Sequence, residues 1–308
     1  MPDSIDLIPL LAILRRSVIR QLSSPSREDE IIVSRYVGFV DIHCHLLPNI
    51  DDGAQGVNEA LSMATLAVEE SIETVVVTPH QLGNYAHNSG QAIRDKTVEF
   101  RQLMAEHQVP LKILPGADVR IEDGVLDKLA CGEVLTLGDH GKHVLLELPH
   151  ELYFSLEGLL RGLRSLGMVG ILSHPERNQG LLSCRGPVER LVDAGCLMQV
   201  TAGSLTGVFG SASQKLAEWA LRKGLVHFVS TDAHGACSRR PLLKECYHRV
   251  VELTDEETAQ ALFSKNPRRV SCGQAVPSGR RAIVSPVTPN WYGFGKALGV
   301  LRGSMLAR

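Results

Sequence analysis

The sequence of 308 residues lacks a long apolar run, a paired cysteine motif and an excess of positive charge. No apolar stretch approaches the roughly 20 residues that a membrane-spanning helix needs, so we expect no membrane span. The seven cysteines are scattered, odd in number and free of CxxC pairs, which argues against a disulfide framework and favours a reducing cytoplasm. A net charge of −2 gives no general attraction to nucleic acid, and we expect no nucleic-acid partner.

The first 38 residues differ from the middle of the chain. They carry an apolar run that positive charges follow rather than precede, and no small-residue cleavage site, so we do not interpret them as a signal peptide. Ile5 to Leu22 is predicted to form an amphipathic helix that packs on the body or on a sister subunit, with a membrane-surface anchor as the alternative. Association into a homo-oligomer therefore stays open.

The C-terminal segment is basic. From Lys265 to Arg308 there are eight Lys or Arg residues and no Asp or Glu, so the net charge of −2 divides into +8 for this segment and −10 for the rest. Its content of Gly, Pro, Ser and Arg is typical of poorly ordered chain. We predict a helical extension over 1–38, a folded domain over 39–263 and a basic, poorly ordered tail over 264–308.

Between these ends, short apolar stretches alternate with helical patterns. The expected strands lie in GFVDIHCH (38–45), ETVVVTPH (73–80), LKILPGADVR (111–120), HVLLELPH (143–150), MVGILSHPER (168–177), CLMQVTAG (196–203) and VHFVSTDAH (226–234). The expected helices cover Val57–Glu70, Gln91–His107, Ser155–Leu166, Pro187–Ala194, Ser211–Lys223, Leu242–Leu253 and Asp255–Phe263. This alternation is typical of an α/β fold with parallel strands covered on both faces.

Polar residues gather where the expected strands end. In a closed or nearly closed barrel of seven parallel strands, all these ends would meet at one mouth, whereas in an open doubly wound sheet they could not share one site. We therefore predict a seven-stranded β/α barrel. The residues concerned are His43, His45, His80, Asp118, Glu147, His174, Asp232 and His234, and a ninth, Asp51 or Asp52, lies in the loop after the first strand.

Taken singly, each of these residues has an ordinary explanation, such as a structural histidine, an ion pair, or a turn at Asp51 and Asp52. Together they predict a metal centre. Residues i and i+2 of a strand share a face, so His43 and His45 point the same way. Nine nitrogen and oxygen ligands are too many for one ion and suit two or three divalent cations. No cysteine belongs to the set, which favours Mn, with Fe or Zn as alternatives, over a cysteine-rich zinc site.

The sequence resembles the polymerase-and-histidinol-phosphatase (PHP) superfamily, and within it the bacterial tyrosine phosphatases of capsule and exopolysaccharide gene clusters. The resemblance covers about Val40 to Phe263. It rests on DIHCHLLPNIDDGAQ, VVVTPH, LPGADVRI, LLELP, SHPERN, QVTAGSLTGVFG and STDAH followed by RR. The HxH and DAH motifs point only to the superfamily, whereas HPERN with QVTAGSLTG is specific to the phosphatase branch.

The resemblance implies a distorted seven-stranded PHP barrel with three metals. The ligands that it implies are His43, His45, Asp52, His80, Asp118, Glu147, His174, Asp232 and His234. It assigns Arg177 and Arg239 to phosphate binding, although Arg240 could take the role of Arg239. The family usually has Glu where this chain has Asp118, a carboxylate that bridges two metals, so the shorter side chain must reach further. The implied substrate is the tyrosine-rich C-terminal tail of a membrane-bound polysaccharide-synthesis kinase. That partner would hold a cytoplasmic enzyme at the inner face of the membrane.

Other functions stay open at this stage. A phosphoesterase of the same superfamily could act on a small molecule such as histidinol phosphate, and a barrel could bind metal as a non-catalytic scaffold. Cys184 to Arg190 also has the Cys-x5-Arg spacing of cysteine-dependent tyrosine phosphatases. In those enzymes consecutive backbone N–H groups cradle the phosphate. Pro187 removes one such donor and is well placed in the first turn of a helix, so we interpret this match as chance.

Overall fold

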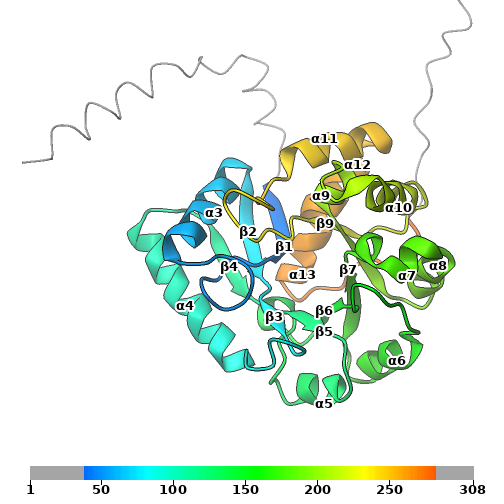
Figure 1. The fold of residues 1–308 in the computed structure, drawn as a ribbon, viewed down its shortest axis with the longest axis horizontal. Helices are drawn as coiled ribbons and strands as arrows, with labels where there is room; N and C mark the ends of the chain where they lie inside the picture. The colour runs from blue at the N-terminus through cyan, green and yellow to red at the C-terminus, as the bar shows by residue number, and fades with distance from the viewer. Residues whose placement is uncertain (1–37, 282–308) are drawn as a thin grey trace, which may run out of the picture. The chain divides into compact units, whose positions relative to one another are not determined.

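The computed structural model describes residues 38–281. The predicted helix from Ile5 to Leu22 and most of the predicted basic tail lie outside the described residues. The element labels used below are those of Figure 1.

The described chain alternates strands and helices, and all of its paired strands are parallel. The strands are β1 (Phe39–Cys44), β2 (Ile72–Val77), β3 (His80–Gln81), β4 (Lys112–Pro115), β5 (Asp118–Arg120), β6 (His143–Glu147), β7 (Val169–Ser173), β8 (Leu197–Thr201) and β9 (Phe228–Ser230). Each of the seven predicted strand stretches overlaps at least one of them. The α/β class with parallel strands is thus confirmed.

The strands form two sheets rather than one continuous ring, with the orders β1-β2-β4 and β3-β5-β6-β7-β8-β9. Two of the predicted strands are interrupted, at Thr78 and Pro79 between β2 and β3 and at Gly116 and Ala117 between β4 and β5. Pro79 has no backbone N–H to donate to a ladder. Backbone bonds still connect the end of β1 with the chain that follows β9: Asp232 N donates to His43 O over 2.7 Å, and His45 N donates to Ala233 O over 2.9 Å.

Helices surround the strands (Figure 1). They are α3 (Val57–Glu69), α4 (Gly90–Glu106), α5 (Val125–Ala130), α6 (Glu157–Ser165), α7 (Gln179–Ser183), α8 (Gly186–Asp193), α9 (Ala202–Leu205), α10 (Gly210–Arg222), α11 (Lys244–Leu253), α12 (Glu256–Gln260) and α13 (Asn266–Ser271). Two short 3-10 turns, η1 (Leu137–Asp139) and η2 (Pro175–Arg177), and a π-helical turn, η3 (Ala261–Lys265), complete the fold. All seven predicted helices are present, with ends that shift by a few residues. Among the described residues, no helix has both the length and the apolar character to cross a membrane.

The space between the strands is filled by apolar side chains, as in the packed interior of a barrel. Six of the nine strands contribute to this cluster, which consists of Val40, Ile42, Val76, Leu137, Leu145, Ile171, Leu197, Phe228 and Val270. Val270 lies in α13, and Arg268 of the same helix donates to Gly38 O over 3.0 Å. The packed structure therefore continues past Phe263, where the sequence placed the start of a poorly ordered tail.

Candidate metal centre

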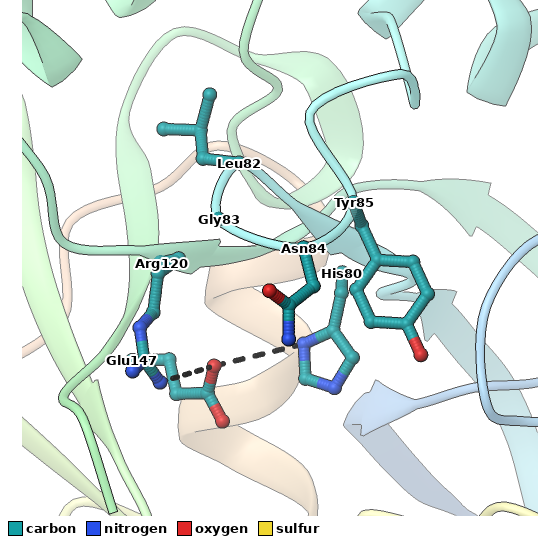
Figure 2. A pocket seen from close by; sticks show the side chains of 7 residues that line it. All are labelled: His80, Leu82, Gly83, Asn84, Tyr85, Arg120 and Glu147. Atoms are coloured by element: carbon teal, nitrogen blue, oxygen red, sulfur yellow. Dashed lines mark ion pairs between the residues drawn. The ribbon is translucent and has the colours of Figure 1, made fainter.

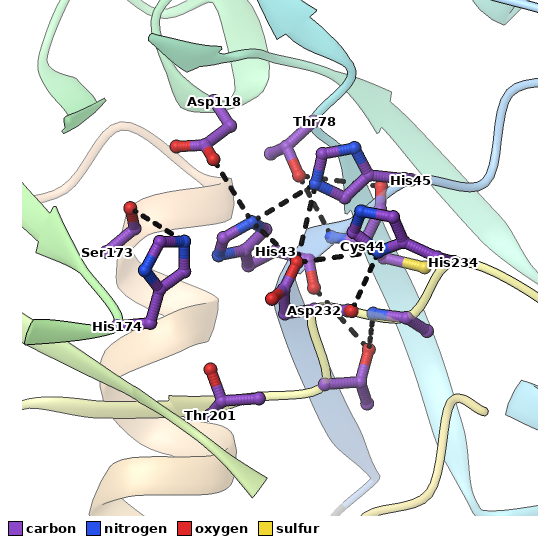
Figure 3. A network of polar contacts seen from close by, with 12 residues as sticks. His43, Cys44, His45, Thr78, Asp118, Ser173, His174, Thr201, Asp232 and His234 are labelled. Carbon is purple, nitrogen blue, oxygen red and sulfur yellow. Dashed lines mark hydrogen bonds and ion pairs between the residues drawn. The ribbon is translucent and has the colours of Figure 1, made fainter. Parts of the chain in front are cut away.

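Eight of the nine candidate ligands lie where strands end or where the chain resumes after an interruption, and the ninth, Asp52, lies in the loop after β1. His43 belongs to β1, His80 and Asp118 open the short strands β3 and β5, and Glu147 closes β6. His45 follows β1, His174 follows β7, and Asp232 and His234 follow β9. Figure 3 shows His43, His45, Asp118, His174, Asp232 and His234 turned toward a common space.

The structure gathers these side chains into four overlapping groups in which one ligand atom from each residue lies within 4.8 Å of the others. The groups are His45, Asp52, His80 and His234; His43, Asp118 and His174; His43, His45 and Asp232; and His80, Asp118 and Glu147. Every one of the nine belongs to at least one group. Because several residues are shared, the groups form one connected cluster that could hold more than one cation.

The loop after β1 folds back over this cluster. Asp52 Oδ1 lies 3.5 Å from His80 Nε2 and 3.6 Å from His234 Nε2. Gly53 permits this path, because a Cβ at that position would lie 2.2 Å from the carbonyl oxygen of His45. The Leu46, Leu47 and Ile50 side chains of the same loop are buried, as expected for packing residues that fix it.

Asp118 is the clearest sign that the cluster suits cations. It is fully buried, and neither of its carboxylate oxygens has a hydrogen-bond partner. Burial raises its pKa, because the charged form is poorly solvated. A buried carboxylate without hydrogen bonds is costly, and the nearest histidine nitrogens, on His43 and His80, lie 3.5 Å and 3.6 Å away. A carboxylate shared by two ligand groups is suited to lie between two cations.

The histidines of the cluster differ in their protonation. Burial lowers the pKa of His80 to about 3 and also lowers the pKa of His174 and His234, so these rings are neutral, the form that binds metal. His45 differs, because Asp51 and Asp232 outweigh its burial and raise its pKa to about 10. The carboxylates near His45 thus favour a positive charge beside this ring, and a bound cation would supply that positive charge.

Two residues that the sequence did not single out as ligands hold the histidines in place. Asp51 Oδ2 accepts from His45 Nδ1 over 2.7 Å and from the backbone N of His80 over 3.0 Å. Gln199 Oε1 lies 2.9 Å from His43 Nδ1. Such partners fix the orientation of a ligating imidazole. The available signal was a polar residue, Gln199, within the apolar strand LMQVT.

The two predicted phosphate-binding arginines lie together beside the cluster. Arg177 and Arg239 both contact the Oδ2 atom of Asp232, Arg239 at 2.5 Å. Their guanidinium carbons lie 4.4 Å and 5.9 Å from the ring centre of Phe209. Arg240 is exposed, so Arg239 rather than its neighbour faces the cluster.

Three of these residues have a left-handed backbone. The φ angles of His174, Asp232 and Arg239 are 32°, 51° and 47°. Residues other than glycine avoid this region, at a cost of roughly 1–3 kcal/mol each. Backbone strain of this kind gathers at functional sites, because the surrounding structure must enforce it.

The Cys-x5-Arg segment has a different geometry. Cys184 is an exposed residue at the end of α7, and the following residues begin α8 with Pro187 in its first turn. The prediction of a helix start at Pro187 is confirmed.

Comparisons with known proteins give a consistent picture. The sequence model of a family described as capsular polysaccharide synthesis, CpsB/CapC, matches residues 39–271. The tyrosine-protein phosphatase YwqE of Bacillus subtilis (strain 168) is 34% identical to this chain over 201 residues, which cover 65% of this chain and 79% of that protein. The tyrosine-protein phosphatase CpsB of Streptococcus pneumoniae is 27% identical over 243 residues, or 77% of this chain and 100% of that protein.

A solved structure is also similar. It is described as belonging to YwqE from Bacillus subtilis and CpsB from Streptococcus pneumoniae, "unique metal-dependent tyrosine phosphatases". It matches this chain with a TM-score of 0.75 and 29% sequence identity, and the match covers 80% of this chain and 100% of that one.

Proposed function

This chain belongs to the CpsB/CapC family of capsular polysaccharide synthesis, and from that premise we propose that it is a metal-dependent protein-tyrosine phosphatase. The observation that carries the proposal is the buried cluster of histidines and carboxylates with two arginines at its edge. Cations and guanidinium groups close together suit the hydrolysis of a phosphate monoester, because both stabilise the charge of the phosphate.

The nine residues would hold two or three divalent cations, with Asp118 between two of the ligand groups. Imidazole and carboxylate donors suit Mn, Fe or Zn, and we favour Mn. When bound, the cations would neutralise phosphate charge and activate water for attack on phosphorus. The carboxylates of the cluster come from Asp52, Asp118, Glu147 and Asp232.

Arg177 and Arg239 would bind and orient the phosphate. Two guanidinium groups face one carboxylate, that of Asp232, so positive charge remains for a dianionic substrate. The planar fork of arginine matches the oxygens of a phosphate. Phe209 lies against both guanidinium groups and would keep them in place through cation–π contacts. The phenolate that leaves has a pKa near 10, so it needs less proton assistance than an alkoxide.

The proposed substrate is a protein that carries phosphotyrosine, and specifically the C-terminal tail of a membrane-bound kinase of polysaccharide synthesis. The family description, capsular polysaccharide synthesis, supports this choice. It would place the enzyme in the cytoplasm, at the inner face of the membrane where its partner lies.

The proposed catalytic unit is a distorted seven-stranded barrel that spans residues 38–281. In this description β2 with β3 and β4 with β5 are single bent strands, and the backbone bonds between β1 and the segment after β9 bring the last strand to the first. The packing of Val270 into the interior supports inclusion of α13 in this unit.

The experiment compares a phosphotyrosine peptide, the matching phosphoserine peptide and histidinol phosphate as substrates. Each is tested with Mn, after chelation, and with the Cys184→Ser variant. We expect hydrolysis of phosphotyrosine that stops on chelation, returns with Mn and persists in Cys184→Ser. Chelator-resistant activity that disappears in Cys184→Ser would overturn the proposal, and a preference for histidinol phosphate would assign the chain to small-molecule substrates.

A further inference from the structure

A pocket opens directly beside the candidate metal centre, and neither Arg177 nor Arg239 lines it. Its volume is about 240 Å³, and two of the candidate ligands, His80 and Glu147, form part of its wall. The remaining lining residues are Leu82, Gly83, Asn84, Tyr85 and Arg120 (Figure 2). A phosphotyrosine bound at the cluster would therefore place its neighbouring residues within reach of this pocket.

One wall of the pocket is the turn from Leu82 to Tyr85, which hydrogen bonds hold in place. Tyr85 N donates to Leu82 O over 3.0 Å, and Gly83 N donates to Glu122 Oε2 over 3.0 Å. The ring of Tyr85 is stacked on that of His80, with 5.3 Å between the centres and 18° between the planes. The turn is thus tied both to the rim beyond β5 and to a candidate ligand, so the pocket is largely preformed.

The other wall carries a third arginine. Arg120 ends β5, two residues after Asp118, and its side chain is 34% exposed. Its Nη1 group donates to Leu148 O over 3.3 Å, which anchors the guanidinium at the pocket. An arginine has five N–H donors, so this anchor leaves others available. In Figure 2 the side chain lies across the view from Tyr85, with Asn84 and Glu147 between them.

The charge of Arg120 is only loosely balanced. Glu147 Oε2 lies 3.6 Å from Arg120 Nη1, beyond a good hydrogen bond, and the same carboxylate lies 3.7 Å from His80 and 3.8 Å from His174. A cation held by Glu147 would draw that carboxylate toward the cluster. Arg177 and Arg239 differ from Arg120, because both form close ion pairs with Asp232.

We propose that Arg120, with Asn84 and Tyr85, forms a subsite that binds an anionic group of the substrate polypeptide next to the phosphotyrosine. The anion is a carboxylate or a second phosphate, because a guanidinium fork matches the oxygens of both. This subsite rests on the proposed phosphatase function, and it would make the enzyme select among phosphotyrosine sequences rather than bind the phosphorylated ring alone.

The test uses one phosphotyrosine peptide with Glu, Gln or Lys at both positions that flank the phosphotyrosine, and a fourth version with a second phosphotyrosine. For the unaltered enzyme with Mn we expect kcat/KM to be about fivefold higher for Glu than for Gln, the size of one partly exposed charge pair, and lowest for Lys. The doubly phosphorylated peptide separates a preference for phosphate from a preference for carboxylate.

The variant Arg120→Glu should invert the order of the Glu and Lys peptides. Arg161→Glu is the matched control, since it makes the same change of net charge at an exposed position of α6 outside the pocket, and it should keep the original order. Equal loss on all four peptides would show that Arg120 only supports Glu147, and it would overturn the subsite.

A second readout separates the subsite from catalysis. Dissociation constants are measured for non-hydrolysable phosphonate versions of the same peptides, with the unaltered protein, Arg120→Glu and Arg120→Gln. The preference for Glu over Gln should disappear in Arg120→Gln and become a preference for Lys in Arg120→Glu, even if either variant is inactive. Unchanged preferences would overturn the subsite. If the unaltered enzyme hydrolyses none of the phosphotyrosine peptides, it is the phosphatase function that fails, and the binding order still decides the subsite.

Discussion

Buried histidines lie at both ends of the strands, and the two ends surround them differently. At the carboxyl ends, His43 Nε2 lies 3.1 Å from Asp232 Oδ1 and 3.5 Å from Asp118 Oδ2. At the amino ends, His227 precedes β9 and is held by backbone groups: its Nδ1 accepts from Met198 N over 3.0 Å, and its Nε2 lies 3.1 Å from Gly279 O. Burial is similar at the two ends, so the chemistry of a histidine is decided by whether carboxylates or peptide groups face it.

The different surroundings of His43 and His227 also explain the opposite shifts of their pKa values. Burial would lower the pKa of His43, but the carboxylates of Asp232 and Asp118 raise it. Burial lowers the pKa of His227 and of His143, which begins β6, to about 4. His227 and His143 at the amino ends are therefore neutral structural residues. Burial also keeps His80, His174 and His234 at the carboxyl ends neutral, whereas His43 and His45 lie among carboxylates that attract cations.

The strongest way to break this comparison is to remove one histidine from each end. His43→Ala should lower kcat/KM on a phosphotyrosine peptide by about a thousandfold, which corresponds to the several kcal/mol that metal ions contribute. His227→Ala should keep its activity per folded molecule and lose about 2 kcal/mol of stability, through lost hydrogen bonds and a cavity. Steady-state kinetics and urea unfolding of both variants test this. A thousandfold loss in His227→Ala at intact stability would contradict the comparison.

A residue behind the ligands should give the next largest effect. Asp51→Asn keeps the shape of a side chain that accepts from His45 Nδ1 but removes its charge. We expect the Mn concentration for half-maximal activity to rise about 10- to 100-fold, as for other partners of metal ligands, with activity restored at saturating Mn. The measurement is activity against free Mn, and an unshifted titration would mean that Asp51 only shapes the turn.

Phe209 should have a smaller effect, confined to phosphate binding. Loss of its ring removes the cation–π contacts with Arg177 and Arg239, each worth about 1 kcal/mol. Phe209→Leu should raise KM by about five- to tenfold, whereas Phe209→Tyr should restore it. Inhibition by inorganic phosphate gives an independent readout. Equal values for the two variants would assign Phe209 to packing alone.

The smallest effect concerns acid stability at the amino ends. Because the folded-state pKa of His227 is lowered to about 4 from an unfolded value near 6.5, its contribution is fully present above pH 6.5 and is lost as the pH falls toward 4. His227→Gln cannot titrate, so the stability advantage of the unaltered protein should shrink between pH 7 and pH 5. Urea unfolding of both proteins after chelation tests this, and a constant difference would contradict it.

The strands and the cluster could be predicted because both leave local signals. A buried parallel strand is a short apolar run, and polar side chains at its end, such as Glu147 after HVLL, are conspicuous. The structure brings the nine residues together, and metal binding by them stays a prediction. Short helices left no such signal: α9 has four residues, too few to display a helical period.

The partners of the ligands could not be predicted for a different reason. His43 and Gln199 are 156 residues apart in the sequence, and their hydrogen bond depends on how β1 and β8 are placed relative to each other in the two sheets. The interruption at Pro79 and the packing of Val270 likewise depend on tertiary geometry. Spacing along the chain cannot encode such contacts, so the sequence indicated the candidate ligands but not the roles of Gln199 and Asp51.

The residues of the site with a left-handed backbone create a conflict between stability and activity. At His174, Asp232 and Arg239 the backbone favours glycine, which would relieve roughly 1–2 kcal/mol at each position. A laboratory screen that rewards heat resistance alone should therefore enrich glycine at these three positions and yield sturdier, inert proteins. Only a screen that also selects for catalytic activity would retain the original residues. The difference in stability between the proteins from the two screens would then measure how much the site destabilises the fold.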